Sequence, residues 1–174
     1  MLNISQQRIF CLKKVSIGGL LVAKSHKGIS NIALGDSREN LLQEFTARFG
    51  DLQQVDDDPI FKREVAHIIT MIETPKLVRK YDFPLDISGT VFQQKVWSVL
   101  CKVPCGETVS YKILAQHIGM PNAFRAVANA CARNELALII PCHRVVCKNG
   151  FISGYRWGVE RKKILLQRER NEES

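Results

Sequence analysis

The sequence contains no apolar run that approaches the length of a membrane-crossing helix, and we expect no membrane partner. It has no internal repeat and no low-complexity tract, which excludes a solenoid and a disordered chain. Residues 1–5 lack the pattern of a secretory signal, so we expect an intracellular protein, cytoplasmic if the source is bacterial and nuclear if it is eukaryotic. The 174 residues, 45% of them hydrophobic, are enough for one globular domain or two small ones.

The cysteines do not have the spacing of a metal site. Cys101 and Cys105 are four residues apart, and no C-x-x-C pair or partnering Cys/His pair follows them. The first half of the chain offers only Cys11, His26 and His67 as soft ligands. Inside a cell all six cysteines should be reduced thiols. We therefore expect neither a bound metal nor another cofactor.

Negative charge is scarce in the second half of the chain. Residues 87–174 carry 13 Lys and Arg against 6 Asp and Glu, whereas residues 1–86 carry 12 against 11. Most of the net charge of +8 therefore belongs to the second half. A basic half indicates a polyanionic partner, although on charge alone a basic surface that binds nothing is an equally good explanation.

The first half has the pattern of a small α/β unit. Three strands are predicted, and they span residues 9–15, 19–23 and 28–34. Ser37 is expected to cap a helix that ends near Phe49, and Pro59 to open a second helix with apolar residues on one face. Pro75, Pro84 and Gly89 then mark a connection. We expect two domains, residues 1–84 and 85–174.

The second half is predicted to be mostly helical, with one helix from Thr90 and a short one over 111–118 capped by Ser110. A turn at 119–121 follows, and Asn122 is expected to cap a further helix that runs to about Arg133. Helix, glycine-containing turn and helix together are typical of a helix-turn-helix, although many all-helical cores contain such a pair.

The last of these helices is unusually slim. Its small residues are Ala123, Ala126, Ala128, Ala130 and Ala132. Alanines on this helix permit a close approach to another surface, and tight helix–helix packing explains part of the pattern equally well. Arg125 among the alanines is harder to explain as a core residue.

A continuous apolar run, Leu136–Ile140, precedes Pro141-Cys142-His143-Arg144 and predicts a buried strand that delivers a cysteine. A thiol must ionise to act as a nucleophile, and we expect His143 and Arg144 to lower the pKa of Cys142. Because neighbours on a strand point to opposite sides, either the backbone turns after Pro141 or a water relays a proton between Cys142 and His143. A buried structural thiol beside a histidine is also common, so the pattern alone leaves both interpretations open.

Pro141-Cys142-His143-Arg144-Val145 resembles the active-site signature of the O6-alkylguanine-DNA alkyltransferases. Further stretches agree with this family in order and spacing, and they are residues 92–97, 104–111, 125–128 and 153–158. The resemblance spans nearly the whole chain, more weakly before residue 84, and is closest to the C-terminal half of the bacterial Ada proteins.

The resemblance implies a mixed α+β fold, with a small ribonuclease H-like α/β domain before a mostly helical domain that carries a helix-turn-helix. It implies a monomer that acts on double-stranded DNA bearing alkylated bases. The alkyl group of O6-alkylguanine, or of O4-alkylthymine, would pass irreversibly to a cysteine of the protein itself. The nucleotide would first be flipped out from the minor groove, and each molecule would act once.

The resemblance also implies catalytic roles for five residues. Cys142 would accept the alkyl group, His143 would act as general base through a water, and Glu169 would orient His143. Tyr111 would donate a hydrogen bond to guanine N3, and Asn134 would hold the turn before the active-site segment.

Contacts with DNA and with the flipped base are implied in the same way. Arg125 would fill the space that the flipped nucleotide leaves in the stack. The other expected contacts are Ala123, Phe124, Ala128, Val145, Tyr155, Arg156 and Trp157. The bulky Trp157, together with Ala137, implies a tight pocket that favours methyl over benzyl groups.

Two other classes of protein would account for part of the sequence pattern. A plain DNA-binding regulator would explain the charge and the helices, but it leaves the Pro141–Val145 signature and Glu169 unexplained. A Cys-His hydrolase would use the same thiol and would turn over repeatedly. Alkyl-transfer stoichiometry separates the three classes. A regulator would transfer no alkyl group, a hydrolase would turn over repeatedly, and an alkyltransferase would stop at one equivalent.

Overall fold

The computed structural model describes residues 7–78 and 80–170. Its first three strands, β1 (Ile9–Val15), β2 (Gly18–Ser25) and β3 (Gly28–Gly35), pair in antiparallel fashion. All three predicted strands are confirmed. A short strand β4 (Gln53–Gln54) pairs in parallel with β1, so the sheet order is β3-β2-β1-β4. The sequence did not predict β4, because two exposed glutamines carry no strand pattern.

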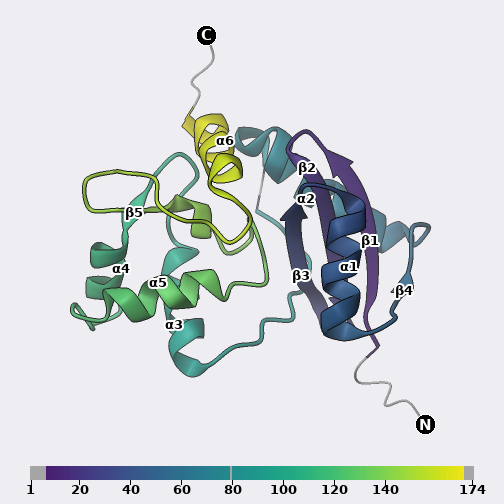
Figure 1. The fold of residues 1–174 in the computed structure, drawn as a ribbon, viewed down its shortest axis with the longest axis horizontal. Helices are drawn as coiled ribbons and strands as arrows, with labels where there is room; N and C mark the ends of the chain where they lie inside the picture. The colour runs from purple at the N-terminus through teal and green to yellow at the C-terminus, as the bar shows by residue number, and fades with distance from the viewer. Residues whose placement is uncertain (1–6, 79, 171–174) are drawn as a thin grey trace. The chain divides into compact units, whose positions relative to one another are not determined.

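Helix α1 (Arg38–Phe49) lies on one face of this sheet (Figure 1). The side chain of Ser37 accepts a hydrogen bond from the backbone N–H of Asn40, which confirms the predicted N-cap. Phe45 packs against Phe10 of β1, with ring centroids 5.5 Å apart. Side chains alternate between the two faces along a strand, and Lys24 of β2 points to the face of the sheet opposite α1.

Helix α2 (Pro59–Glu73) covers that second face, and Pro59 opens it as predicted. Lys24 forms an ion pair with Glu64 of α2, with 2.8 Å between Nζ and Oε2. Asp58 caps the helix by accepting a hydrogen bond from the N–H of Phe61 at 2.7 Å. The α/β pattern of the first half is thus a sheet with a helix on each face.

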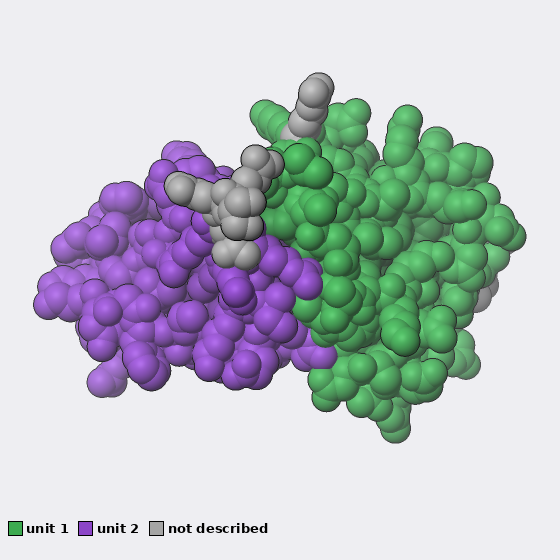
Figure 2. Space-filling view, turned by 90° about the horizontal axis from the view of Figure 1, so that it is seen from above, with its two compact units in different colours: residues 1–87 green, residues 88–174 purple. Residues whose placement is uncertain are grey.

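The molecule divides between Ile87 and Ser88 into two compact units, which Figure 2 shows in different colours. A short 3-10 helix, η2 (Pro75–Leu77), follows α2. Ile29 of β3 then exchanges backbone hydrogen bonds with Pro84 and Asp86, at 3.0 and 2.8 Å. This pairing keeps the segment after Pro84 with the first unit, whereas the sequence pattern places the boundary between Pro84 and Leu85.

Among residues 88–170, four α-helices build the second unit, and they are α3 (Val91–Leu100), α4 (Tyr111–His117), α5 (Phe124–Ala132) and α6 (Val159–Arg170). Thr90 and Gln93 form a reciprocal capping box at the start of α3, and Ser110 caps α4. The indole N–H of Trp97 donates to the carbonyl of Ala130 at 3.0 Å and ties α3 to α5.

The start of α5 differs from the prediction. Asn122 lies in the preceding turn, and α5 begins at Phe124 with Ala123 at the N-cap and no side-chain cap. The cause is a backbone hydrogen bond of 2.9 Å from the N–H of Ala123 to the carbonyl of Met120, which extends the turn by a residue.

Two very short strands complete the second unit. Strand β5 (Val109–Ser110) pairs in parallel with β6 (Val145–Val146), and the 3-10 helix η3 (Cys142–Arg144) lies directly before β6. Within the part of the chain that the structure describes, no helix is both long and apolar enough to span a bilayer.

Candidate active site

The apolar segment Leu136–Ile140 leads into the site, and it is a buried loop rather than the predicted strand. Leu138 has a φ of 74°, which breaks extended geometry. The side chain of Asn134 replaces a strand partner, because its amide donates to the carbonyls of Leu136 and Ile140 at 3.3 and 2.9 Å. Its oxygen accepts from the N–H of Leu136 at 2.8 Å. An apolar run therefore stays buried here without a β-ladder.

The backbone turns immediately after Pro141, so one of the two alternatives left open by the sequence is observed. The N–H of Arg144 bonds to the carbonyl of Pro141 at 2.9 Å, and Cys142 lies on the resulting turn. Its sulfur lies 3.2 Å from the Asn134 amide nitrogen, which donates to it. The thiol in turn lies 3.4 Å from the carbonyl of Cys131, to which it donates.

Burial raises the pKa of Cys142 well above that of an ordinary thiol, and the hydrogen bond from Asn134 opposes this only in part. The expectation that His143 and Arg144 lower this pKa is wrong, because both side chains are directed to Glu169. In the resting protein Cys142 is therefore a neutral thiol, and a base must take its proton before it reacts.

His143 is placed to be that base. Its Nε2 lies 2.6 Å from Oε1 of Glu169, whose pKa is lowered to about 2 by hydrogen bonds from His143 and Arg144 against the effect of burial. Burial lowers the pKa of His143, so the ring is neutral near pH 7. The ionised carboxylate can only accept, so Nε2 carries the ring proton and Nδ1 has the free lone pair. Nδ1 is buried and has no hydrogen-bond partner among the described residues.

Glu169 is itself held in place by Arg144, whose Nε and terminal nitrogen donate to its oxygens at 3.0 and 2.9 Å. Arg144 also donates to the carbonyl of Val103 at 2.7 Å. Arg144 thus holds the Glu169 carboxylate in place, and the carboxylate in turn fixes the orientation of the His143 ring.

Cys142 lines a pocket of about 330 Å³, a volume large enough for a small organic group. Five predicted site residues line it, and they are Tyr111, Ala128, Cys142, Tyr155 and Arg156. Cys131, Ala132 and Gly154 complete the lining.

Two tyrosines are among the polar residues that line this pocket. The hydroxyl of Tyr111 accepts from Ser153 at 3.4 Å, and burial raises the pKa of Tyr111, so it remains a proton donor. The hydroxyl of Tyr155 is buried and has no partner among the described side chains and backbone. Trp157 is not part of the lining, and instead packs edge-on against Tyr155 with ring centroids 5.3 Å apart.

Lys162 is a site residue that the sequence interpretation missed. It is fully buried, and its Nζ donates to the carbonyl of Gly154 at 3.2 Å. Burial lowers the pKa of Lys162, while the nearby thiols of Cys131 and Cys142 raise it. A signal was present, because Lys162 stands three residues before Leu165 on the buried face of α6.

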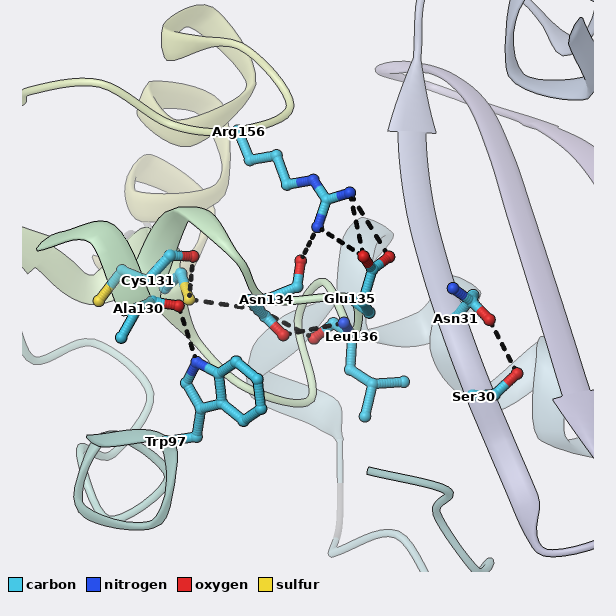
Figure 3. Close-up of polar contacts among 10 residues, drawn as sticks. Ser30, Asn31, Trp97, Ala130, Cys131, Asn134, Glu135, Leu136 and Arg156 are labelled. Atoms are coloured by element: carbon cyan, nitrogen blue, oxygen red, sulfur yellow. Dashed lines mark hydrogen bonds and ion pairs between the residues drawn. The ribbon is translucent and has the colours of Figure 1, made fainter. Parts of the chain in front are cut away.

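The remaining predicted residues lie around this centre. Val145 is completely buried in β6, while Phe124 and Arg125 are exposed and Ala123 half-buried at the start of α5. Arg156 bonds to the carbonyl of Asn134 and forms an ion pair with Glu135 at 3.3 Å, as Figure 3 shows. The site therefore consists of a pocket around Cys142 and a separate exposed start of α5.

Comparisons with known proteins show which family the chain is similar to. The family model for the 6-O-methylguanine DNA methyltransferase DNA-binding domain matches residues 91–171. The bifunctional transcriptional activator/DNA repair enzyme Ada of Escherichia coli is 48% identical over 167 residues, which are 94% of this chain and 46% of that protein. The regulatory protein Ada of Salmonella typhimurium is 50% identical over 90% of this chain and 44% of its own length. The chain thus spans about half the length of these two relatives.

Relatives of similar length are also found. A methylated-DNA–protein-cysteine methyltransferase of Methanosarcina barkeri is 37% identical over 89% of this chain and 92% of its own. The crystal structure of Mycobacterium tuberculosis OGT in complex with DNA has a TM-score of 0.76 at 33% identity, and covers 93% of this chain and 92% of that one. The mixed α+β fold is thereby confirmed. The chain belongs to the methylated-DNA–protein-cysteine methyltransferase family.

Proposed function

We propose that this chain repairs alkylated DNA by moving the alkyl group of O6-alkylguanine, and of O4-alkylthymine, onto Cys142. The observation that carries the proposal is the pocket itself, which has a buried thiol at its wall and a His143–Glu169 pair beside it. The partner is double-stranded DNA that bears alkylated bases, and the protein acts as a monomer in the compartment that holds the DNA, the cytoplasm of a bacterium or the nucleus of a eukaryote.

The residues divide the chemistry between them. The proton of the Cys142 thiol passes through a water to Nδ1 of His143, and Glu169 stabilises the resulting imidazolium. The thiolate then attacks the alkyl carbon, a carbon–sulfur bond forms and the bond from carbon to O6 breaks. Tyr111 donates a hydrogen bond to N3 of the departing guanine as negative charge builds on it. A thioether remains, and no group in the site reverses it, so each molecule acts once.

The target base must leave the duplex before this reaction. We assign residues 85–174 to DNA binding and alkyl transfer, with α4 and α5 as a helix-turn-helix that enters the minor groove. Arg125 would fill the vacated space in the stack, which offsets part of the cost of extruding the base. Residues 1–84 would form a ribonuclease H-like domain, and the order β3-β2-β1-β4 with β4 parallel to β1 supports that assignment.

Pocket size should select the alkyl group. Trp157 packs against Tyr155, which lines the pocket, and so restricts how far the tyrosine ring can move outward. We propose that methyl groups are transferred faster than benzyl groups for this reason. Equal rates for the two lesions would reject this part of the proposal.

The direct test mixes the protein with a duplex that carries one O6-methylguanine. The proposal predicts that lesion loss stops at one equivalent of protein and that peptide mass spectrometry finds one added methyl on the peptide with Cys142. A regulator would leave the lesion intact, and a hydrolase would clear more than one equivalent.

A further inference from the structure

Phe124 combines bulk and exposure at the start of α5. Its side chain is 48% exposed although it is a large aromatic residue. The residues of α5 that are not buried are otherwise short, apart from Arg125, and they are Ala126, Ala128, Asn129 and Ala132. Two long side chains therefore project from an otherwise slim helix surface.

The helix spacing places Phe124 in line with the pocket. Residues four apart lie on the same side of an α-helix, so Phe124, Ala128 and Ala132 form one row. Ala128 and Ala132 both line the pocket at Cys142. Phe124 consequently stands one helical turn before Ala128, on the same side of α5 as the two alanines that line the pocket.

The surroundings of Phe124 suit the minor groove of DNA. Met120, whose carbonyl accepts from the N–H of Ala123 in the turn before α5, is a second exposed apolar residue at the start of α5, with 45% of its side chain exposed. Arg125 follows directly, and the second half of the chain carries 13 Lys and Arg against 6 Asp and Glu. A cationic surface with an apolar tip matches DNA, because proteins commonly insert apolar side chains between base steps from this groove.

From this placement we infer that Phe124 is an aromatic wedge that unstacks the base step next to the target nucleotide. The inference rests on the proposed function and adds a second residue to the opening of the duplex. Successive residues of a helix point about 100° apart, so Phe124 and Arg125 reach different places in the DNA. Arg125 replaces the departed base, whereas Phe124 weakens the stacking that holds it beforehand.

The test compares Phe124→Ala and Phe124→Leu on two substrates, an O6-methylguanine duplex and the same lesion in a single strand. Opening a duplex costs stacking and pairing energy that a single strand does not demand. We expect Phe124→Ala to slow transfer in the duplex about tenfold and in the single strand less than about twofold, and Phe124→Leu to retain most of the rate. A fluorescent base analogue beside the lesion reports the eversion directly.

The matched control is Phe151→Ala, because Phe151 is a second exposed phenylalanine of the same unit, 71% exposed and outside α5. Its rates should stay within about twofold of the unaltered protein on both substrates. An equal loss on duplex and single strand, no loss at all, or the same loss in Phe151→Ala would each overturn the wedge. Failure of the unaltered protein to transfer methyl from either substrate would instead overturn the proposed function.

Discussion

The two ring nitrogens of His143 have different environments, and the proposed proton transfer from Cys142 depends on this difference. Nε2 donates to a carboxylate with a pKa of about 2, while Nδ1 keeps a free lone pair in a buried setting. The ring is thus prepared to accept one proton at one defined atom. Cys142 is not ionised in advance, since burial raises its pKa. The reactive anion would therefore form only when His143 accepts the proton of the thiol.

The Glu169 carboxylate should also stabilise the fold in a pH-dependent way. Its pKa is depressed from 4.5 to about 2, so its contribution is complete above pH 4.5 and is lost as the pH falls from 4.5 towards 2. The shift corresponds to a free energy of unfolding on the order of 3 kcal/mol. Urea unfolding should therefore show Glu169→Gln to be clearly less stable than the unaltered chain at pH 6, with a smaller difference at pH 3.

Glu160→Gln provides the control for that comparison, because Glu160 is on the same helix with an 82% exposed side chain. It should change stability by less than about 0.5 kcal/mol at either pH. A Glu169→Gln deficit that is the same at pH 6 and pH 3 would contradict the assigned carboxylate.

At the scale of elements, the side chain of Asn134 makes the backbone hydrogen bonds that a neighbouring strand would otherwise make. The sequence predicts a strand over Leu136–Ile140 because an apolar run is the usual sign of one, and pattern alone cannot show that a single amide satisfies the backbone instead. Helices were easier to predict, since Ser37, Thr90 and Ser110 are caps with a local mechanism. Strands β5 and β6 have two residues each, too few for any periodicity.

Part of the candidate site was likewise predictable from the sequence, and part was not. The resemblance in sequence pointed to Cys142, Tyr111 and Tyr155, which the structure brings into one pocket. It did not point to Lys162, because a lysine within a helix is normally expected to face solvent. The direction of the Cys142 pKa was also beyond reach, since it depends on burial and on where Arg144 points.

Replacing Asn134 should destabilise the second unit strongly. Asn134→Ala removes the partner of the Leu136 N–H and one of the two hydrogen bonds to the Ile140 carbonyl, both inside a buried loop. Leaving the buried Leu136 N–H unpaired costs about 1–3 kcal/mol, and the bonds lost at the Ile140 carbonyl and the Cys142 sulfur add to this cost. We therefore expect a loss of about 3 kcal/mol in the free energy of unfolding. Chemical denaturation measures it against Asn129→Ala, an exposed asparagine of α5. Similar losses for the two variants would refute the role given to Asn134.

Over the whole molecule the charge is uneven, with a nearly neutral first half and a basic second half. Such a distribution favours binding to any duplex through phosphates, before a lesion is met. The proposed repair of scattered damage would need this property, because the protein would have to survey undamaged sequence. Specificity would then come from the pocket and not from base readout along the groove.

Affinity for undamaged duplex should therefore depend steeply on salt. Between about 50 and about 200 mM monovalent salt, we expect binding to weaken at least about tenfold, with little dependence on sequence. Fluorescence anisotropy with two unrelated duplexes measures both properties. Affinity that is insensitive to salt, or that differs widely between the two duplexes, would contradict electrostatic scanning.

The central claim is that one sulfur, that of Cys142, receives the alkyl group, and Cys142→Ser tests it most directly. The variant should bind an O6-methylguanine duplex as the unaltered protein does and remove no methyl. Cys131→Ser is the matched control, since Cys131 lines the same pocket, and it should still stop at one equivalent. The account would be contradicted if Cys142→Ser removed the lesion, or if Cys131→Ser failed to remove it.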